Sequence, residues 1–160
     1  MPIMLTLDTS TTCTGAAVWK NGELQSVTSL YSTPGELCRD MEMIKEIILY
    51  IVKIKPDIVI CEDLNVINNI AVAKKLSGII GAVNGVCIYK NIFFDKISPK
   101  IWRKLITGEN TPPKHRKELK QWDIEQVKIL FNIDVKNDDE ADAVLLGEAY
   151  KRLCILEGEE

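Results

Sequence analysis

Apolar and polar residues alternate over the first thirty positions of the chain in a pattern that predicts three β-strands. Residues 3–8 alternate weakly, and residues 15–20 and 24–31 have the composition of two further strands. Asn21-Gly22, between the last two, is typical of a two-residue hairpin turn. The chain is therefore expected to begin as three antiparallel strands.

The next segment predicts a helix followed by a buried strand. Thr33-Pro34-Gly35-Glu36 has Thr at a helix N-cap, Pro at the first helical position and Glu to complete a capping box. The apolar stripe expected to bury against the sheet is formed by Leu37, Met41, Ile44, Ile48 and Ile51. Pro56-Asp57 ends this helix, and residues 58–61 are an all-apolar run typical of a buried parallel strand.

The rest of the chain alternates between helical and strand patterns. The expected elements are a helix over about 69–89, a strand over 92–97, a helix from Ser98-Pro99 to Gly108, a helix over 114–131 and a last helix from Asn137 to about Leu153. Asn137 is a good N-cap for the last helix, and Glu140 can close a capping box there. This order of elements predicts one α/β domain over residues 1–160, a mixed sheet with helices on its faces.

Composition is that of an ordinary globular domain, with 160 residues, 46% of them hydrophobic and 27% charged. No stretch reaches the roughly 18 consecutive apolar residues of a membrane span, and no secretory signal is visible at the N-terminus. We therefore expect a cytoplasmic protein with no membrane partner. The five cysteines form no C-x-x-C pair, which indicates reduced thiols, and the three tryptophans are expected to be packing residues.

Charge is distributed unevenly along the chain. Residues 96–120 contain eight Lys and Arg and two acids, whereas residues 134–160 contain nine acids and three basic residues. A basic segment beside an acidic one is typical of a metal-dependent enzyme that acts on a polyanion. Solvated surface faces produce the same pattern, and charge alone does not choose between the two.

Four carboxylates occupy positions that suggest a metal site. Asp8 and Glu62 end predicted strands, and ligands of open α/β sheets bind at the carboxyl ends of strands. Asp139 and Asp142 are three residues apart and share the face of the last helix that must bury. Buried carboxylates are costly unless a cation or hydrogen-bond donors compensate them, and a metal such as Mg²⁺, which carboxylate oxygens bind, would do so.

Three motifs carry a resemblance to a known family. They are "LDTSTTCTGAAV", with Asp8 and Thr14-Gly15, "VICEDLNV", with Glu62, and "DEADAV", with Asp139 and Asp142. Together with the order of elements, they resemble the RuvC-like Holliday junction resolvases of the ribonuclease H-like superfamily, over essentially the whole chain. The small size and divergent sequence are more similar to the phage-encoded branch than to the bacterial enzymes.

The resemblance implies a ribonuclease H-like fold, with a five-stranded sheet in which strands 1–3 are antiparallel and strands 1, 4 and 5 are parallel. It implies a homodimer that binds four-way and other branched DNA and nicks it by metal-dependent phosphodiester hydrolysis, in the host cytoplasm if the protein is phage-encoded. Asp8, Glu62, Asp139 and Asp142 would be catalytic residues that hold two Mg²⁺ ions, with Mn²⁺ able to substitute.

The basic segment also has counterparts in the family. Lys114 would stabilise the transition state, and Arg103 would contact a phosphate. The residues expected to bind DNA are Arg103, Lys104, Lys114, Arg116 and Lys117. The roles of His115 and of the hydroxyls in residues 9–14 stay open.

The helix over about 69–89 carries three glycines, Gly78, Gly81 and Gly85, on neighbouring turns. Its backbone could therefore approach another element closely. The related enzymes use the equivalent helix as a dimer contact, and packing on the sheet of its own subunit explains the glycines equally well.

Two other functions stay open. The opening segment also resembles actin/hexokinase-like proteins of tRNA threonylcarbamoyl modification, some of which are non-catalytic partners. That alternative predicts a longer, two-lobed chain and gives Glu62, Asp139 and Asp142 no role. The other is a catalytically silent DNA-binding module of ribonuclease H-like fold, against which the intact set of four acids argues.

Overall fold

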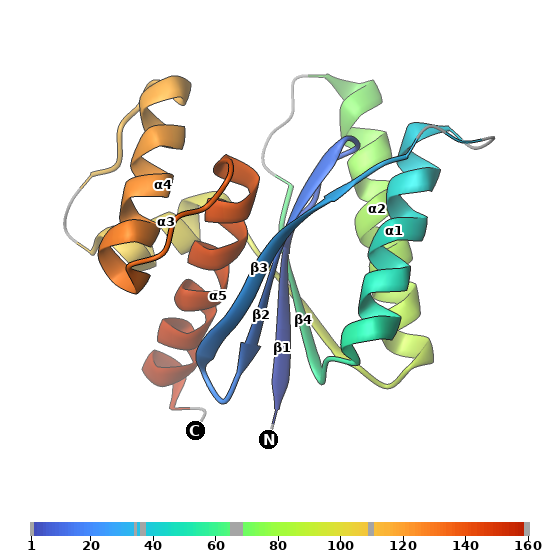
Figure 1. Ribbon diagram of the computed structural model, residues 1–160, viewed down its shortest axis with the longest axis horizontal. Coiled ribbons are helices and arrows are strands. Elements are labelled where there is room, and N and C mark those ends of the chain that lie inside the picture. Colours follow the sequence, from blue (N-terminus) through green and yellow to red (C-terminus); the bar gives the residue numbers. More distant parts are fainter. Residues whose placement is uncertain (1, 34, 36–37, 65–68, 109–110, 159–160) are drawn as a thin grey trace.

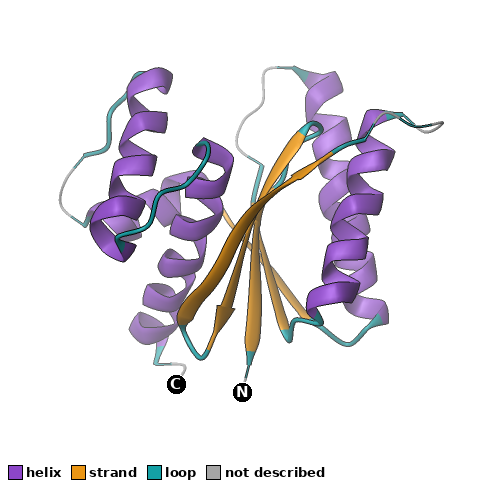
Figure 2. Cartoon of the chain, viewed as in Figure 1, coloured by secondary structure: helices purple, strands orange, loops and turns teal. Residues whose placement is uncertain are grey.

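A computed structural model of the chain has a five-stranded sheet with helices on both faces (Figure 2). The structure describes residues 2–33, 35, 38–64, 69–108 and 111–158. The strands are β1 (Ile3–Asp8), β2 (Cys13–Lys20), β3 (Glu23–Tyr31), β4 (Ile58–Glu62) and β5 (Phe93–Ile97). The helices are α1 (Arg39–Ile54), α2 (Ile70–Tyr89), α3 (Pro99–Thr107), α4 (Arg116–Phe131) and α5 (Asp138–Glu157).

The strand order is β3-β2-β1-β4-β5, which confirms the expected mixed sheet. β2 runs antiparallel to β1 and β3, whereas β1, β4 and β5 run parallel. Asn21 and Gly22 close the β2–β3 hairpin with φ values of 54° and 78°, as a type I′ turn requires. Helices α1 and α2 cover one face of the sheet, and α3, α4 and α5 lie on the other side (Figure 1).

Each face of the sheet has its own apolar core, because successive side chains of a strand point to opposite faces. In β1, Leu5 and Leu7 are buried in the core under α1 and α2. Thr6 lies on the other face, where its hydroxyl donates a 2.6 Å hydrogen bond to the Ala143 carbonyl oxygen of α5. Asp8, two residues after Thr6, is therefore on the α5 face.

The same alternation places the acid at the end of β4. Cys61 is buried in the α1–α2 core and Ile60 in the α5 core, so Glu62 faces α5. Leu7 pairs with Cys61 in the parallel ladder between β1 and β4. Asp8 and Glu62 are thus the next residues along two neighbouring strands, on one face of the sheet.

Helix α1 begins later than the sequence predicts. Its first residue is Arg39, and Cys38 is its N-cap, with no side-chain capping hydrogen bond. Pro34 and Glu36, of the predicted start signal, lie outside the described residues, as does Leu37 of the predicted stripe.

The buried face of α1 is rotated from the predicted one, and the two faces share Ile51. Ile51 is fully buried as predicted, together with Met43 and Ile47. Met41 is 48% exposed, and Ile44 and Ile48 are only partly buried. Residues three or four apart share a helix face, and this segment has apolar residues at that spacing on two neighbouring faces. The sequence periodicity alone does not show which of the two faces is buried, because contact with the sheet determines it.

Helix α2 is long and apolar enough to cross a membrane, judged by length and composition alone. In this fold its Ile79, Val83 and Cys87 are buried in the core shared with α1 and the sheet. Its three glycines are exposed, and a Cβ atom on any of them would meet nothing within 4 Å. The glycines therefore do not serve close packing within the described part of the chain.

Candidate functional site

An acid-rich pocket of about 450 Å³ lies at the carboxyl ends of β1 and β4, on the face of the sheet that α5 covers. It is lined by Asp8, Ser10, Glu62, Pro99, Arg103, Arg116, Leu119, Lys120, Asp123, Asp138, Asp139 and Asp142. The structure therefore brings together all four acids that the sequence predicts as a site, from β1, β4 and α5.

The first turn of α5 lies directly against the backbone of β2 at Gly15. A Cβ atom on Gly15 would lie 1.8 Å from the Asp139 carbonyl oxygen, so no larger residue fits this approach. Gly15 pairs with Asp8 across the β1–β2 ladder. This contact therefore sets how close the helix acids Asp139 and Asp142 come to the strand acid Asp8.

A buried carboxylate, Glu140, anchors the same turn to β3. Asn137 is the N-cap of α5, as predicted, and its Oδ1 accepts a 2.9 Å hydrogen bond from the Glu140 N–H. The Glu140 side chain, only 2% exposed, accepts 2.8 Å hydrogen bonds from the Ser29 hydroxyl and the Lys136 N–H. The N-cap half of the predicted capping box is therefore confirmed, and the other half is wrong, because the Glu140 side chain reaches β3 and Lys136 instead of the N-cap backbone.

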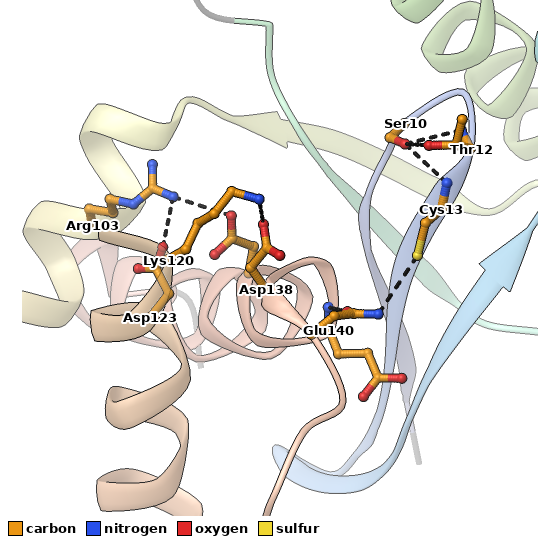
Figure 3. A network of polar contacts seen from close by, with 10 residues as sticks. Ser10, Thr12, Cys13, Arg103, Lys120, Asp123, Asp138 and Glu140 are labelled. Carbon is orange, nitrogen blue, oxygen red and sulfur yellow. Dashed lines mark hydrogen bonds and ion pairs between the residues drawn. The ribbon is translucent and has the colours of Figure 1, made fainter. Parts of the chain in front are cut away.

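Hydroxyl side chains organise the loop between β1 and β2. The Ser10 hydroxyl oxygen accepts hydrogen bonds from the N–H groups of Thr12 and Cys13, at 3.2 and 3.1 Å (Figure 3). The Thr14 hydroxyl oxygen accepts one from the Ser10 N–H at 3.2 Å. Ser and Thr side chains commonly satisfy turn donors in this way. Much of the hydroxyl-rich stretch is thereby explained as turn structure beside Asp8.

Helix α3 places two adjacent side chains at the pocket. Trp102 is fully buried, as expected of a packing residue, and its indole Nε1–H donates a 2.7 Å hydrogen bond to Glu62 Oε2. The Arg103 guanidinium lies over the Trp102 ring, 4.2 Å from its centroid. The predicted Ser98-Pro99 helix start is confirmed, and it puts both residues in the first turns of α3.

Arg103 bridges two carboxylates inside the pocket. Its Nη2 lies 3.1 Å from Asp123 Oδ2, on α4, and 3.2 Å from Asp142 Oδ2, on α5. Figure 3 shows Arg103 directed at Asp123, with Lys120 and Asp138 in contact beside them. Asp123, which is 1% exposed, was not predicted from the sequence. Its spacing of four residues from the buried Val127, on one helix face, is the signal that could have identified it.

The acids of the pocket are poorly hydrated and close to one another. The pKa of Asp8 is raised well above its ordinary value, mainly by burial and further by the nearby carboxylates of Glu62 and Asp139. The pKa of Asp142 is also raised well above its ordinary value, mainly by burial and further by the carboxylates of Asp8 and Asp123. Burial also raises the pKa values of Glu62 and Asp139. Carboxylates in such an environment gain stability from a bound cation.

The donor set fits a hard divalent cation. It consists of carboxylate oxygens, which Mg²⁺ and Mn²⁺ prefer, and Asp142 Oδ1 is buried with no hydrogen-bond donor. Among the described residues, no three His, Cys, Asp or Glu side chains already enclose a point where a metal ion would fit. The Arg103 guanidinium now lies among these acids, with its Nη2 3.2 Å from Asp142 Oδ2.

The predicted basic residues divide between the pocket and the surface. Arg103 and Arg116 line the pocket. Lys104, Lys114 and Lys117 are exposed and are not among the described residues that line it, and His115 is exposed just before α4. Lys120, which is not among the residues predicted to bind DNA, lines the pocket and forms an ion pair with Asp138.

Comparison with known proteins finds similarity in structure and not in sequence. No family model and no curated protein matches the chain. RuvC of Thermus thermophilus in complex with a Holliday junction substrate is similar with a TM-score of 0.78, at 15% identity over 99% of this chain and 98% of that one. The fowlpox virus Holliday junction resolvase gives 0.65, at 17% identity over 92% and 97% of the two chains. The yeast mitochondrial Holliday junction resolvase Ydc2 gives 0.67, at 12% identity over 93% and 77%. The chain therefore has the fold of the RuvC-like resolvases, as the sequence motifs predict.

Proposed function

We propose that this protein, which has the RuvC-like fold, is a metal-dependent endonuclease that resolves Holliday junctions and other branched DNA. The observation that carries the proposal is the convergence of Asp8, Glu62, Asp139 and Asp142 on one pocket. The similar solved structures include RuvC with a Holliday junction substrate and the fowlpox virus resolvase with Holliday junction DNA.

In this proposal the four acids hold two Mg²⁺ ions, and Mn²⁺ can substitute. When bound, such ions supply Lewis acidity to the scissile phosphate and to the attacking water. The protein orients the acids before the substrate arrives, because Trp102 hydrogen-bonds Glu62 and the close contact at Gly15 fixes the first turn of α5.

Basic residues then bind the phosphates around the cleavage point. Arg116 and Lys120 line the pocket, which supports a role for both in neutralising the scissile phosphate. The wider DNA contact is assigned to Arg103, Lys104, Lys114, Arg116 and Lys117. Lys114 keeps its role in stabilising the transition state on the family resemblance alone.

The protein is proposed to act as a homodimer, because paired nicks across a four-way junction require two sites. The exposed glycine face of α2 supports this proposal, since it continues into Ile88 and Tyr89, which are 69% and 85% exposed. Small residues let two helices approach closely, and a two-fold dimer uses the same face twice. A cytoplasmic location and a phage origin belong to the same proposal.

A nicking assay on a synthetic four-way junction tests the function. The purified protein is expected to cut with Mg²⁺ or Mn²⁺ and not in EDTA. Asp8→Asn should abolish cutting while the junction still binds, because one metal-binding carboxylate is lost. Asp134→Asn removes the same charge from a side chain that is 89% exposed and lies outside the pocket lining, so it should cut like the wild type.

Three outcomes would contradict the proposal. Cutting in EDTA would exclude the metal mechanism, and unchanged cutting by Asp8→Asn would remove that residue from it. Junction binding without cutting, at any metal concentration, would favour the catalytically silent module. Lys114→Ala is expected to slow cutting more than it weakens junction binding, and the reverse would make it a simple phosphate contact.

A further inference from the structure

The ion pairs of Arg103 leave hydrogen-bonding atoms unused on the guanidinium and on both of its carboxylate partners. A single nitrogen, Nη2, contacts both Asp123 and Asp142, and the Arg103 Nε–H is buried with no acceptor. With both acids ionised, Asp123 Oδ1 and Asp142 Oδ1 are also buried with no donor. Three buried polar atoms around one guanidinium therefore lack partners, although such atoms are nearly always satisfied in folded proteins.

Two of these three atoms are complementary to each other. An arginine and a carboxylate form their strongest contact through two parallel hydrogen bonds, in which both carboxylate oxygens accept from the guanidinium. If Arg103 turned fully to Asp123, its Nε–H and Nη2–H would face the two oxygens of Asp123. That arrangement would remove the guanidinium from Asp142 and leave its carboxylate oxygens available to a cation.

The surroundings of Arg103 permit this movement. The guanidinium is stacked on Trp102, at 4.2 Å from the ring centroid, which keeps it beside both acids. Its side chain is 16% exposed, while that of Asp123 is 1% exposed and that of Asp142 is 15% exposed. Asp123 is therefore the deeper acceptor, and Asp142 is the acid on the open side of the pocket.

We propose that Asp123 is a positioning residue that draws Arg103 away from Asp142 when a divalent metal ion binds. In the metal-free protein Arg103 neutralises Asp142, and in the metal-bound protein it pairs with both oxygens of Asp123. The inference rests on the proposed metal site and adds to it a fifth acid that acts through Arg103.

The inference is tested by measuring Mn²⁺ binding to the protein without DNA. The electron paramagnetic resonance signal of free Mn²⁺ is the readout. The four proteins are the wild type, Asp123→Asn, Arg103→Met and the double variant. Asp123→Asn leaves Arg103 on Asp142, so the Kd for Mn²⁺ should rise by roughly fivefold or more. In the Arg103→Met background the same substitution should change the Kd by less than about twofold, because the residue it acts through is gone.

Asp138→Asn is the matched control, because it removes one charge from the same pocket but from an acid paired with Lys120. Its effect on the Kd should be the same with Arg103 or Met at position 103. If Asp123→Asn behaves like this control, or binds Mn²⁺ like the wild type, the inference is wrong. If the wild type shows no saturable Mn²⁺ binding, the proposed metal site fails, and the inference fails with it.

A second measurement needs no variant and so does not depend on the folding of Asp123→Asn. The ¹⁵N resonance of Arg103 Nε, assigned through bonds in the wild type, should shift when Mg²⁺ is added and its N–H gains an acceptor. A resonance that stays in place while Mg²⁺ binds would overturn the inference.

Discussion

Substitution of Gly15 by alanine is expected to move the helix acids Asp139 and Asp142 away from the strand acid Asp8. The new Cβ would lie 1.8 Å from the Asp139 carbonyl oxygen, whereas real contacts of this kind essentially never fall below 3.0 Å. The first turn of α5 must therefore move by about 1.2 Å or more, against a neighbour that is backbone and cannot rotate away. Such overpacking costs about 1–3 kcal/mol of stability. A displacement of about 1 Å at a catalytic group lowers a rate by roughly 10²-fold.

Urea unfolding and single-turnover junction cutting, both in saturating Mg²⁺, measure the two effects. Lys53→Ala is the control, because Lys53 is exposed on α1 and lies outside the pocket lining. An exposed substitution of this kind should change the stability by no more than about 0.5 kcal/mol and leave the cutting rate unchanged. A Gly15→Ala protein with the stability and cutting rate of the wild type would refute the claim that this contact positions Asp139 and Asp142.

Three further predictions concern single side chains. Trp102→Phe keeps an aromatic ring, although a smaller one, and removes the hydrogen bond to Glu62, so it should cost about 1–3 kcal/mol in urea unfolding and weaken Mn²⁺ binding. Unchanged Mn²⁺ binding would contradict the orienting role of Trp102. Burial and nearby acids raise the pKa of Asp8, so the native state holds this proton more tightly than the unfolded state does. Unfolding in EDTA should therefore show stability that falls as pH rises from the ordinary aspartate range near 4 towards the raised pKa, with a smaller slope in Asp8→Asn. Glu140→Ala removes the acceptor of the Ser29 hydroxyl and of a backbone N–H, and thermal unfolding should show a loss of about 2–4 kcal/mol, while a loss below about 0.5 kcal/mol would argue against the anchor.

The strand acids could be predicted because strand periodicity carries positional information. Side chains alternate strictly along β1 and β4, so the strand boundaries alone put Asp8 and Glu62 at one edge of the sheet. Asp139 and Asp142 were predictable for a similar reason, since three residues is close to one helical turn. In both cases the local periodicity of the strand or helix determines the direction in which the side chain points.

The partners of these acids could not be predicted, because they depend on how separate helices pack. Arg103 has the sequence context of a solvated basic residue, and only the packing of α3 against α4 and α5 brings it to Asp123 and Asp142. The rotated face of α1 has the same origin, since Met41 and Met43 both belong to helical apolar ladders and only the sheet selects one.

Helix α5, which carries two of the four acids, is synthesised after the other helices and all the strands of the described part of the chain. A nascent chain that has reached Asp134 contains Asp8 and Glu62 but neither of the helix acids, which lie on α5, Asp138–Glu157. The same helix fills the core on its face of the sheet with Leu145 and Leu146, so that core closes in the same folding event. Chains fold from the N-terminus as they leave the ribosome. The acid pocket is therefore completed only after the first turns of α5 have been synthesised, and until then the growing chain carries two of the four acids.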